Sequence, residues 1–132
     1  MELKDIRWRQ RFDNFERSYV LLKEYLEIHA PSKIERAGGV QYFEICFELS
    51  WKMLKDYLEF QGLIVNSPRE AIKQSFQNGI IQQGDIWLKA LEDRNLTTHT
   101  YDETKASQLD DKIHGEYFQI LKTLYEFFKE KR

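Results

Sequence analysis

One short segment of the sequence gathers side chains that could carry out chemistry. Residues 94–101 (RNLTTHTY) combine a guanidinium (Arg94), an amide (Asn95), an imidazole (His99) and a phenol (Tyr101). Arginine presents a planar set of donors that suits a phosphate, and histidine takes up and releases a proton near neutral pH. Cleavage of a phosphodiester without a metal needs a base for a ribose 2′-hydroxyl and a cation for the charge that develops on phosphorus. The segment is therefore either a site of this kind or a polar loop that caps the following helix.

A second group of candidate residues lies upstream, where Glu48 and Lys52 are four residues apart and flank Trp51. Opposite charges at this spacing stabilise a helix by a few tenths of a kcal/mol. Because Trp51 leads toward the expected core, the pair is either partly buried, which needs a structural or functional reason, or part of a solvated face.

Other classes of site find little support in the sequence. The residues that most often bind transition metals are far apart in the chain: His29, Cys46, His99 and His114. No two of them share a helix face at the spacing that a metal site needs. The glycine pair at positions 38–39 lacks the lysine and the spacing of a phosphate-binding loop, and no GxGxxG motif is present. We therefore expect neither a metal nor a cofactor.

Composition narrows the class of protein. The chain has 132 residues, of which 42% are hydrophobic and 14% aromatic, so it can bury a core and form one domain over residues 1–132. Two Pro and six Gly are few for a fold built from many strands, which needs frequent turns. The formal charge of −2 argues against a general nucleic-acid coat but allows a local basic site. The single cysteine, the charged N-terminus and the lack of a long apolar run predict a cytoplasmic protein outside the membrane.

Apolar residues recur with helical spacing along most of the chain. Residues 3–29 lack Pro and Gly and predict a long amphipathic helix, closed by Pro31, whose ring restricts Ala30 to extended geometry. After the glycine pair, residues 40–61 predict a second long helix, which is apolar over so much of its circumference that it should be central. Gly62 is placed to end it. The apolar stripe of this second helix comprises Phe43, Phe47, Trp51, Leu54 and Leu58, widened by Ile45, Leu49 and Met53.

Two shorter helices and a third long one complete the expected fold. Residues 67–70 (SPRE) carry a serine cap, a proline at the first helical position and a glutamate that can reach back to the Ser67 N–H. The short helix that begins here should stop at residues 78–79. The next helix begins at residues 84–85 and should end near Arg94, because the β-branched segment that follows is a poor helix interior. The last should run from about Thr104 to Lys129. The sequence thus predicts an all-α, antiparallel up-and-down bundle of three long and two shorter helices.

On these residues the sequence resembles HEPN domains, which are small helical bundles of prokaryotic toxins and RNases. The arrangement Arg94-x4-His99-x-Tyr101 resembles their RX4HXY motif. Residues 42–58 (YFEICFELSWKMLKDYL) resemble a signature of one branch, the nucleotidyltransferase substrate-binding proteins, which are encoded beside a minimal nucleotidyltransferase. The resemblance covers nearly the whole chain.

The resemblance implies a homodimer in which two copies of the motif face a shared cleft. It implies that Arg94 and His99 are the residues of a metal-independent ribonuclease and that Asn95 is a supporting polar group. It also implies a toxin–antitoxin pair, in which the partner nucleotidyltransferase acts as antitoxin by transferring AMP to Tyr101.

Two other interpretations stay open. In one, the chain is a non-catalytic subunit that binds a nucleotide or substrate for the nucleotidyltransferase, and Arg94 and His99 only contact phosphate. In the other, it is a structural dimerisation bundle. A homodimer is also favoured by the aromatic content (three Trp, seven Tyr and nine Phe), which exceeds what a small core readily encloses.

Overall fold

The computed structural model describes residues 2–97 and 102–132, and throughout these residues the regular structure is helical. The all-α bundle predicted from the sequence is confirmed. The helices in chain order are α1 (Leu3–Leu26), α2 (Lys33–Phe60), α3 (Pro68–Gln77), α4 (Gly84–Thr97), α5 (Glu103–Lys112), the π-helical turn η1 (Ile113–Tyr117) and α6 (Phe118–Lys131).

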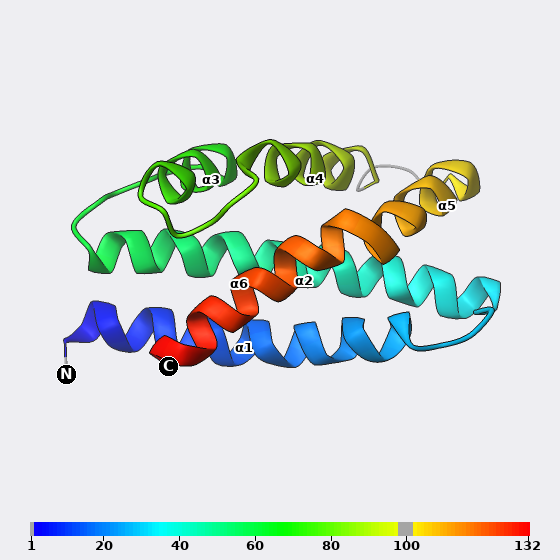
Figure 1. Ribbon diagram of the computed structural model, residues 1–132, viewed down its shortest axis with the longest axis horizontal. Coiled ribbons are helices and arrows are strands. Elements are labelled where there is room, and N and C mark those ends of the chain that lie inside the picture. The colour runs from blue at the N-terminus through cyan, green and yellow to red at the C-terminus, as the bar shows by residue number, and fades with distance from the viewer. Residues whose placement is uncertain (1, 98–101) are drawn as a thin grey trace.

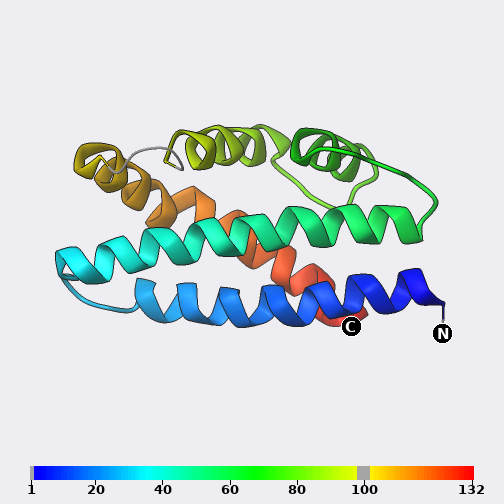
Figure 2. The ribbon, with the colours of Figure 1, turned by 180° about the vertical axis from the view of Figure 1, so that it is seen from behind.

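The helices form two layers around α2 (Figure 1). Helices α1 and α2 lie antiparallel, and α3 and α4 follow one another along the other side of α2. Helix α6 crosses α1 and α2 obliquely on one face, and the opposite face, seen in Figure 2, is formed by α1 and α2 themselves. The central position predicted for α2 is confirmed.

Helix α2 begins seven residues earlier than the sequence analysis predicts, at Lys33 instead of residue 40. The Ser32 hydroxyl accepts from the Glu35 N–H at 3.1 Å, and the Glu35 carboxylate accepts from the Ser32 N–H at 2.9 Å. This reciprocal capping box starts the helix, so the glycines at 38–39 lie within it. Gly39 is needed for close packing, because a Cβ at this position would lie 2.2 Å from Cε2 of Tyr25 on α1.

The connection between α1 and α2 also differs from expectation. Helix α1 ends at Leu26, and Ala30, expected to be extended before Pro31, has a φ of 51°. The chain reverses direction within a few residues here, and the left-handed conformation of Ala30 makes the turn shorter. For a residue other than glycine, this conformation costs about 1 kcal/mol or more.

The signals predicted at the end of α2 and at the start of α3 are confirmed. Gly62 has a φ of 94°, and the Leu63 N–H donates to the Leu58 carbonyl at 2.8 Å, which closes the C-terminus of α2. Ser67 caps α3 by accepting from the Glu70 N–H at 3.1 Å. The Glu70 carboxylate differs in one detail, because it accepts from the Asn66 N–H instead of from Ser67.

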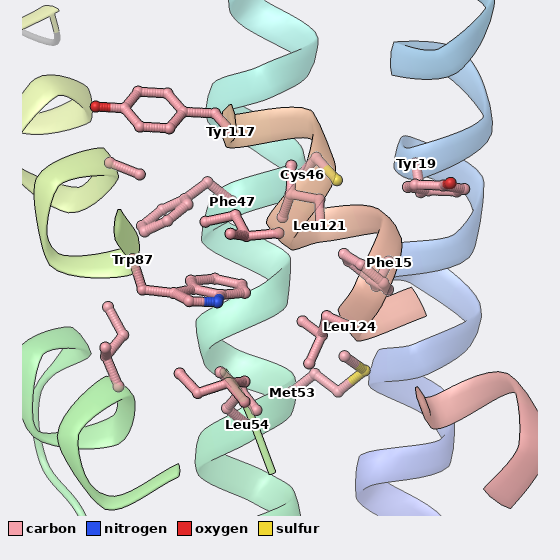
Figure 3. Close-up of a cluster of buried hydrophobic side chains, with 14 of the residues drawn as sticks. Phe15, Tyr19, Cys46, Phe47, Met53, Leu54, Trp87, Tyr117, Leu121 and Leu124 are labelled. Carbon is pink, nitrogen blue, oxygen red and sulfur yellow. The ribbon is translucent and has the colours of Figure 1, made fainter. Parts of the chain in front are cut away.

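The core is one continuous cluster to which every helix contributes. Figure 3 shows Trp87 of α4 directed at α2, beside Phe47, while Met53 of α2 and Phe15 of α1 lie near α6. Burying a side chain of this size contributes about 1.5–3 kcal/mol relative to its exposure. Cys46 is fully buried in the same cluster, and Ile45, expected to widen the apolar stripe of α2, is instead 43% exposed.

The last helix is not continuous. It is divided into α5, η1 and α6 at Gly115, whose φ and ψ of −109° and −115° are not helical. A glycine accommodates this break because it has no Cβ. None of the helices in the described part of the chain is long and apolar enough to cross a membrane.

Candidate functional site

Arg94 and Asn95 lie in the last turn of α4. The sequence analysis placed the end of this helix near Arg94, but the helix continues through Thr97. The helical turn therefore fixes where these two side chains leave the backbone. The other two candidates of the segment, His99 and Tyr101, lie outside the described residues.

The Arg94 guanidinium meets Glu48 of α2. Its Nη2 donates to Oε2 of Glu48 at 2.6 Å, and its Nη1 donates to Oδ1 of Asn95 at 3.3 Å. The Arg94 and Glu48 side chains are 25% and 31% exposed, so the pair lies at the edge of the bundle, partly shielded from water. The structure thus joins Arg94 to Glu48, two candidates that are 46 residues apart in the chain.

Glu48 accepts hydrogen bonds from two side chains and forms an ion pair with a third. Besides Arg94, the indole Nε1 of Trp51 donates to Oε2 of Glu48 at 3.0 Å, and the Lys52 ammonium lies 3.5 Å from Oε1. Trp51 is half-buried, and its nitrogen turns toward the carboxylate. The polar cluster predicted at Glu48 and Lys52 is therefore partly buried, and it faces the motif arginine with two cations around one carboxylate.

Asp93 is a member of this region that the sequence analysis missed. Its Oδ2 accepts from the Tyr117 hydroxyl at 2.5 Å and from the Lys112 ammonium at 2.9 Å. Burial, and after it the hydrogen bond to Asp93, raises the pKa of Tyr117 far above its ordinary value. These contacts tie the last turn of α4 to α5 and η1, so Arg94 is carried by a helix end that is anchored on two sides. The sequence contains no local signal for them, because the partners are 19 and 24 residues apart.

A pocket of about 140 Å³ lies between the end of α4 and α5. Its lining residues come from the helices that precede and follow residues 98–101. They are Asp93, Leu96, Lys105, Gln108, Leu109 and Lys112.

The described histidines do not join this region. His114 lies 3.5 Å from the buried Asp110 carboxylate and packs against the Tyr25 ring, and His29 is exposed in the α1–α2 connection. Within residues 2–97 and 102–132, no three or more His, Cys, Asp and Glu side chains gather as a metal site requires.

A comparison with known protein families gives a match over most of the chain. Residues 10–130 match the family described as nucleotidyltransferase substrate-binding protein like. The chain belongs to this family. The resemblance to the nucleotidyltransferase substrate-binding branch of HEPN domains is thereby confirmed, and the match covers nearly all of the described helices.

Two individual proteins are similar to this chain at the same sequence identity. The probable ribonuclease HepT of Haemophilus influenzae is 32% identical over 84 residues, which are 57% of this chain and 58% of that protein. The match thus spans little more than half the length of this curated relative. A crystal structure of a protein from Thermus thermophilus is 32% identical, covers 83% of this chain and 94% of its own, and superposes with a TM-score of 0.76.

Proposed function

We propose that this protein is the HEPN-type ribonuclease subunit of a two-component toxin–antitoxin pair and that it cleaves RNA without a metal. The observation that carries the proposal is the Arg94 guanidinium, which Glu48 holds at the junction of α2 and α4 at 2.6 Å. Family membership and the relative described as a probable ribonuclease support it.

The proposed reaction uses two side chains. His99 removes the proton of a ribose 2′-hydroxyl, and the 2′-oxygen attacks the adjacent phosphorus. The bond from phosphorus to the 5′-oxygen breaks, and the 5′-oxygen takes up a proton from water. Arg94 stabilises the additional negative charge on the phosphoryl oxygens. Because Glu48 and Asn95 fix the guanidinium before RNA binds, little reorganisation is needed in the transition state.

Regulation falls to Tyr101 and a minimal nucleotidyltransferase. In the proposal this partner transfers AMP from a nucleoside triphosphate to the Tyr101 hydroxyl, with release of pyrophosphate. The added phosphate brings negative charge that pairs with Arg94 and occupies the place of an RNA phosphate. Tyr101→Phe is expected to keep ribonuclease activity and to gain no adenylate mass when it is co-expressed with the partner. An adenylate found on the Phe variant, or an unmodified wild-type chain beside an active partner, would remove Tyr101 from the mechanism.

The active form is proposed to be a homodimer. Leu21 and Tyr42 are partly exposed and line a groove of about 470 Å³ between α1 and α2. Each three-residue step turns about 60° around an α-helix, so on the surface of α2 Ile45 lies between Tyr42 and Glu48. A second copy that covered this apolar surface would also approach the Arg94–Glu48 pair.

Cleavage of single-stranded RNA by the purified chain, in the presence of a chelator, tests the catalytic proposal. Arg94→Ala and His99→Ala should each lower the rate at least about 100-fold, in keeping with the loss of one acid–base or charge-stabilising group. Arg69→Ala and His29→Ala, which change exposed residues of the same types elsewhere, should cleave normally. Equal activity of all four variants, or unfolding of the Arg94 or His99 variant, contradicts the assignment.

The alternative function is a non-catalytic subunit that binds a nucleotide for the nucleotidyltransferase. The description of the matching family as substrate-binding favours it. Nucleotide binding that is lost in Arg94→Ala, with no RNA cleavage by the wild-type chain, would select this alternative.

A further inference from the structure

The pocket between α4 and α5 has the size of a single ring. Its volume of about 140 Å³ is close to the cavity of about 150 Å³ in which a protein core can bind benzene. Leu96 from α4 and Leu109 from α5 supply apolar surface, and Leu96 is 60% exposed although it is a large hydrophobic residue. The pocket thus offers a ring-shaped group an apolar surface that residues 2–97 and 102–132 leave uncovered.

Some polar residues of the lining make side-chain contacts within the described part of the chain, and others do not. Asp93 is satisfied by Tyr117 and Lys112 within the fold. In contrast, within the described residues the Lys105 ammonium has no carboxylate partner and the Gln108 amide makes no side-chain hydrogen bond. The pocket therefore combines an ammonium available to an anion with an amide that can both donate and accept.

The charges of the lining suit an anionic ligand. Lys105 and Lys112 outnumber Asp93, so the six lining residues carry one excess positive charge. Lys105, Gln108 and Lys112 recur at spacings of three and four on α5, so they present one face to the pocket. An apolar slot for one ring, an amide at its edge and an excess of ammonium groups are the features that bind a base together with its phosphate.

We propose that this pocket is a nucleotide subsite that selects a pyrimidine, with the base against Leu96 and Leu109, its edge hydrogen-bonded by Gln108 and a phosphate on Lys105. The proposal rests on the proposed function, since it assumes that RNA is the ligand of the neighbouring Arg94. Asp93 and Arg94 are consecutive residues of α4, and Asp93 faces the pocket while Arg94 faces α2. One nucleotide of the substrate can therefore occupy the pocket while a neighbouring phosphate meets Arg94.

Binding of mononucleotides to the full wild-type chain, followed by nuclear magnetic resonance, tests the pocket without depending on cleavage. UMP and CMP should shift the signals of Leu96, Gln108 and Leu109 and should bind at least fivefold more tightly than AMP and GMP. Gln108→Ala and Lys105→Ala should each weaken UMP binding about fivefold, as expected for one lost hydrogen bond. Leu96→Trp, which fills the pocket from an exposed position, should reduce the affinity for UMP at least tenfold.

The control variants are Gln119→Ala and Lys73→Ala, which change exposed residues outside the pocket. Both should bind UMP as the wild type does.

A short single-stranded RNA distinguishes the roles of the two side chains. For the inactive His99→Ala chain, Lys105→Ala should lower the slope of log K against log salt concentration by about 0.7, the contribution of one phosphate contact in a single strand. Gln108→Ala should leave that slope unchanged and reduce the preference for pyrimidines.

The outcomes separate this proposal from the proposed ribonuclease activity. Equal binding of purine and pyrimidine nucleotides, signal changes confined to other surfaces, or unaltered binding by the pocket variants overturns the subsite even if Arg94 and His99 are required for cleavage. UMP binding that maps to the pocket in a chain that cleaves no RNA supports the subsite and rejects the ribonuclease.

Discussion

At the scale of residues, the ion pair between Arg94 and Glu48 is better suited to orientation than to stability. Its two side chains retain about a quarter to a third of their exposure, and ion pairs in such places contribute about 1 kcal/mol or less. The carboxylate that receives the guanidinium is itself held from a second side, by the 3.5 Å pair of Glu48 with Lys52. We therefore assign Glu48 a positioning role toward Arg94.

Glu48→Ala is expected to lower the rate of RNA cleavage about tenfold or more, because Arg94 loses the contact that orients it. The free energy of unfolding should change by about 1 kcal/mol or less, measured by urea denaturation. Glu48→Gln should recover part of the rate, since the amide oxygen still accepts from the guanidinium.

Glu59→Ala is the matched control, because Glu59 also lies on α2 and pairs with an arginine, Arg7, at 3.5 Å. It should leave cleavage unchanged. A Glu48 variant with the cleavage rate of the wild type would show that Arg94 does not depend on this carboxylate.

At the scale of elements, the packing of α1 on α2 depends on which of two adjacent glycines is replaced. A Cβ at Gly39 would meet the Tyr25 ring, whose hydroxyl is tied to Asp110 at 2.6 Å, so the ring cannot simply move away. A Cβ at Gly38 would meet nothing within 4 Å.

Gly39→Ala should therefore lower the free energy of unfolding by about 1–3 kcal/mol through overpacking. Gly38→Ala should raise it by up to about 1 kcal/mol, because alanine is the better helix former. Thermal or urea unfolding of the two variants measures the difference. Equal changes in the free energy of unfolding at the two positions would show that α1 and α2 can move apart at Gly39 without loss of stability.

The docking of α6 on α1 should depend on pH. A hydrogen bond from Tyr125, followed by one from Lys129, lowers the pKa of Glu16 from its ordinary value of 4.5. A hydrogen bond from Arg132 lowers the pKa of Asp13 from 3.8. Because each carboxylate is more acidic in the folded chain, its stabilising contribution is complete above its ordinary pKa and is lost as the pH falls through the lower, folded value.

The melting temperature of the wild type should thus exceed that of a Tyr125→Phe, Arg132→Ala double variant at pH about 6, and the gap should narrow as the pH falls below the ordinary pKa values of 4.5 for Glu16 and 3.8 for Asp13. Lys122→Ala, on the same helix, should parallel the wild type at every pH. A gap that persists in acid would mean that the variant loses packing and not charge interactions.

Several helix ends that local chemistry determines could be predicted from the sequence, although the capping box of Ser32 and Glu35 was missed. Features that depend on distant contacts could not be predicted. The caps at Ser67 and Gly62 involve residues a few positions apart, and both are confirmed. Gly39 resembled a helix breaker because its reason, the Tyr25 ring, lies on another helix. The break at Gly115 was also missed, because the apolar spacing predicts one unbroken helix from about Thr104 to Lys129.

The candidate site follows the same division. Its motif could be found by residue spacing, and family membership supports that interpretation. The contact of Arg94 with Glu48 and the anchoring of Asp93 by Tyr117 join separate helices, so no local pattern reveals them. The roles of His99 and Tyr101 stay predictions.

At the scale of the whole molecule, the exposed apolar residues of α1 and α2 predict a homodimer. Tyr42→Ala combined with Ile45→Glu should convert the dimer to a monomer in sedimentation experiments and should lower RNA cleavage, because the proposed cleft needs two copies. Ile64→Glu changes an isoleucine that is 73% exposed after α2, and it should leave the dimer intact. A wild-type chain that sediments only as a 16.0 kDa species at tens of micromolar would contradict the prediction.

Because Cys46 is buried, the rate at which its thiol is labelled reports how often the core opens. Burial raises the pKa of this thiol to about 12, and the sequence holds no other cysteine. A thiol reagent can therefore modify the native chain only while the core around α2 is open. For an unfolding free energy of at least about 5 kcal/mol, labelling should be slowed more than about 1000-fold relative to the denatured chain. The labelling rate then measures core opening in the unaltered protein, and a ligand that binds only the folded chain should slow labelling by the factor 1 + [L]/Kd, where [L] is the free ligand concentration.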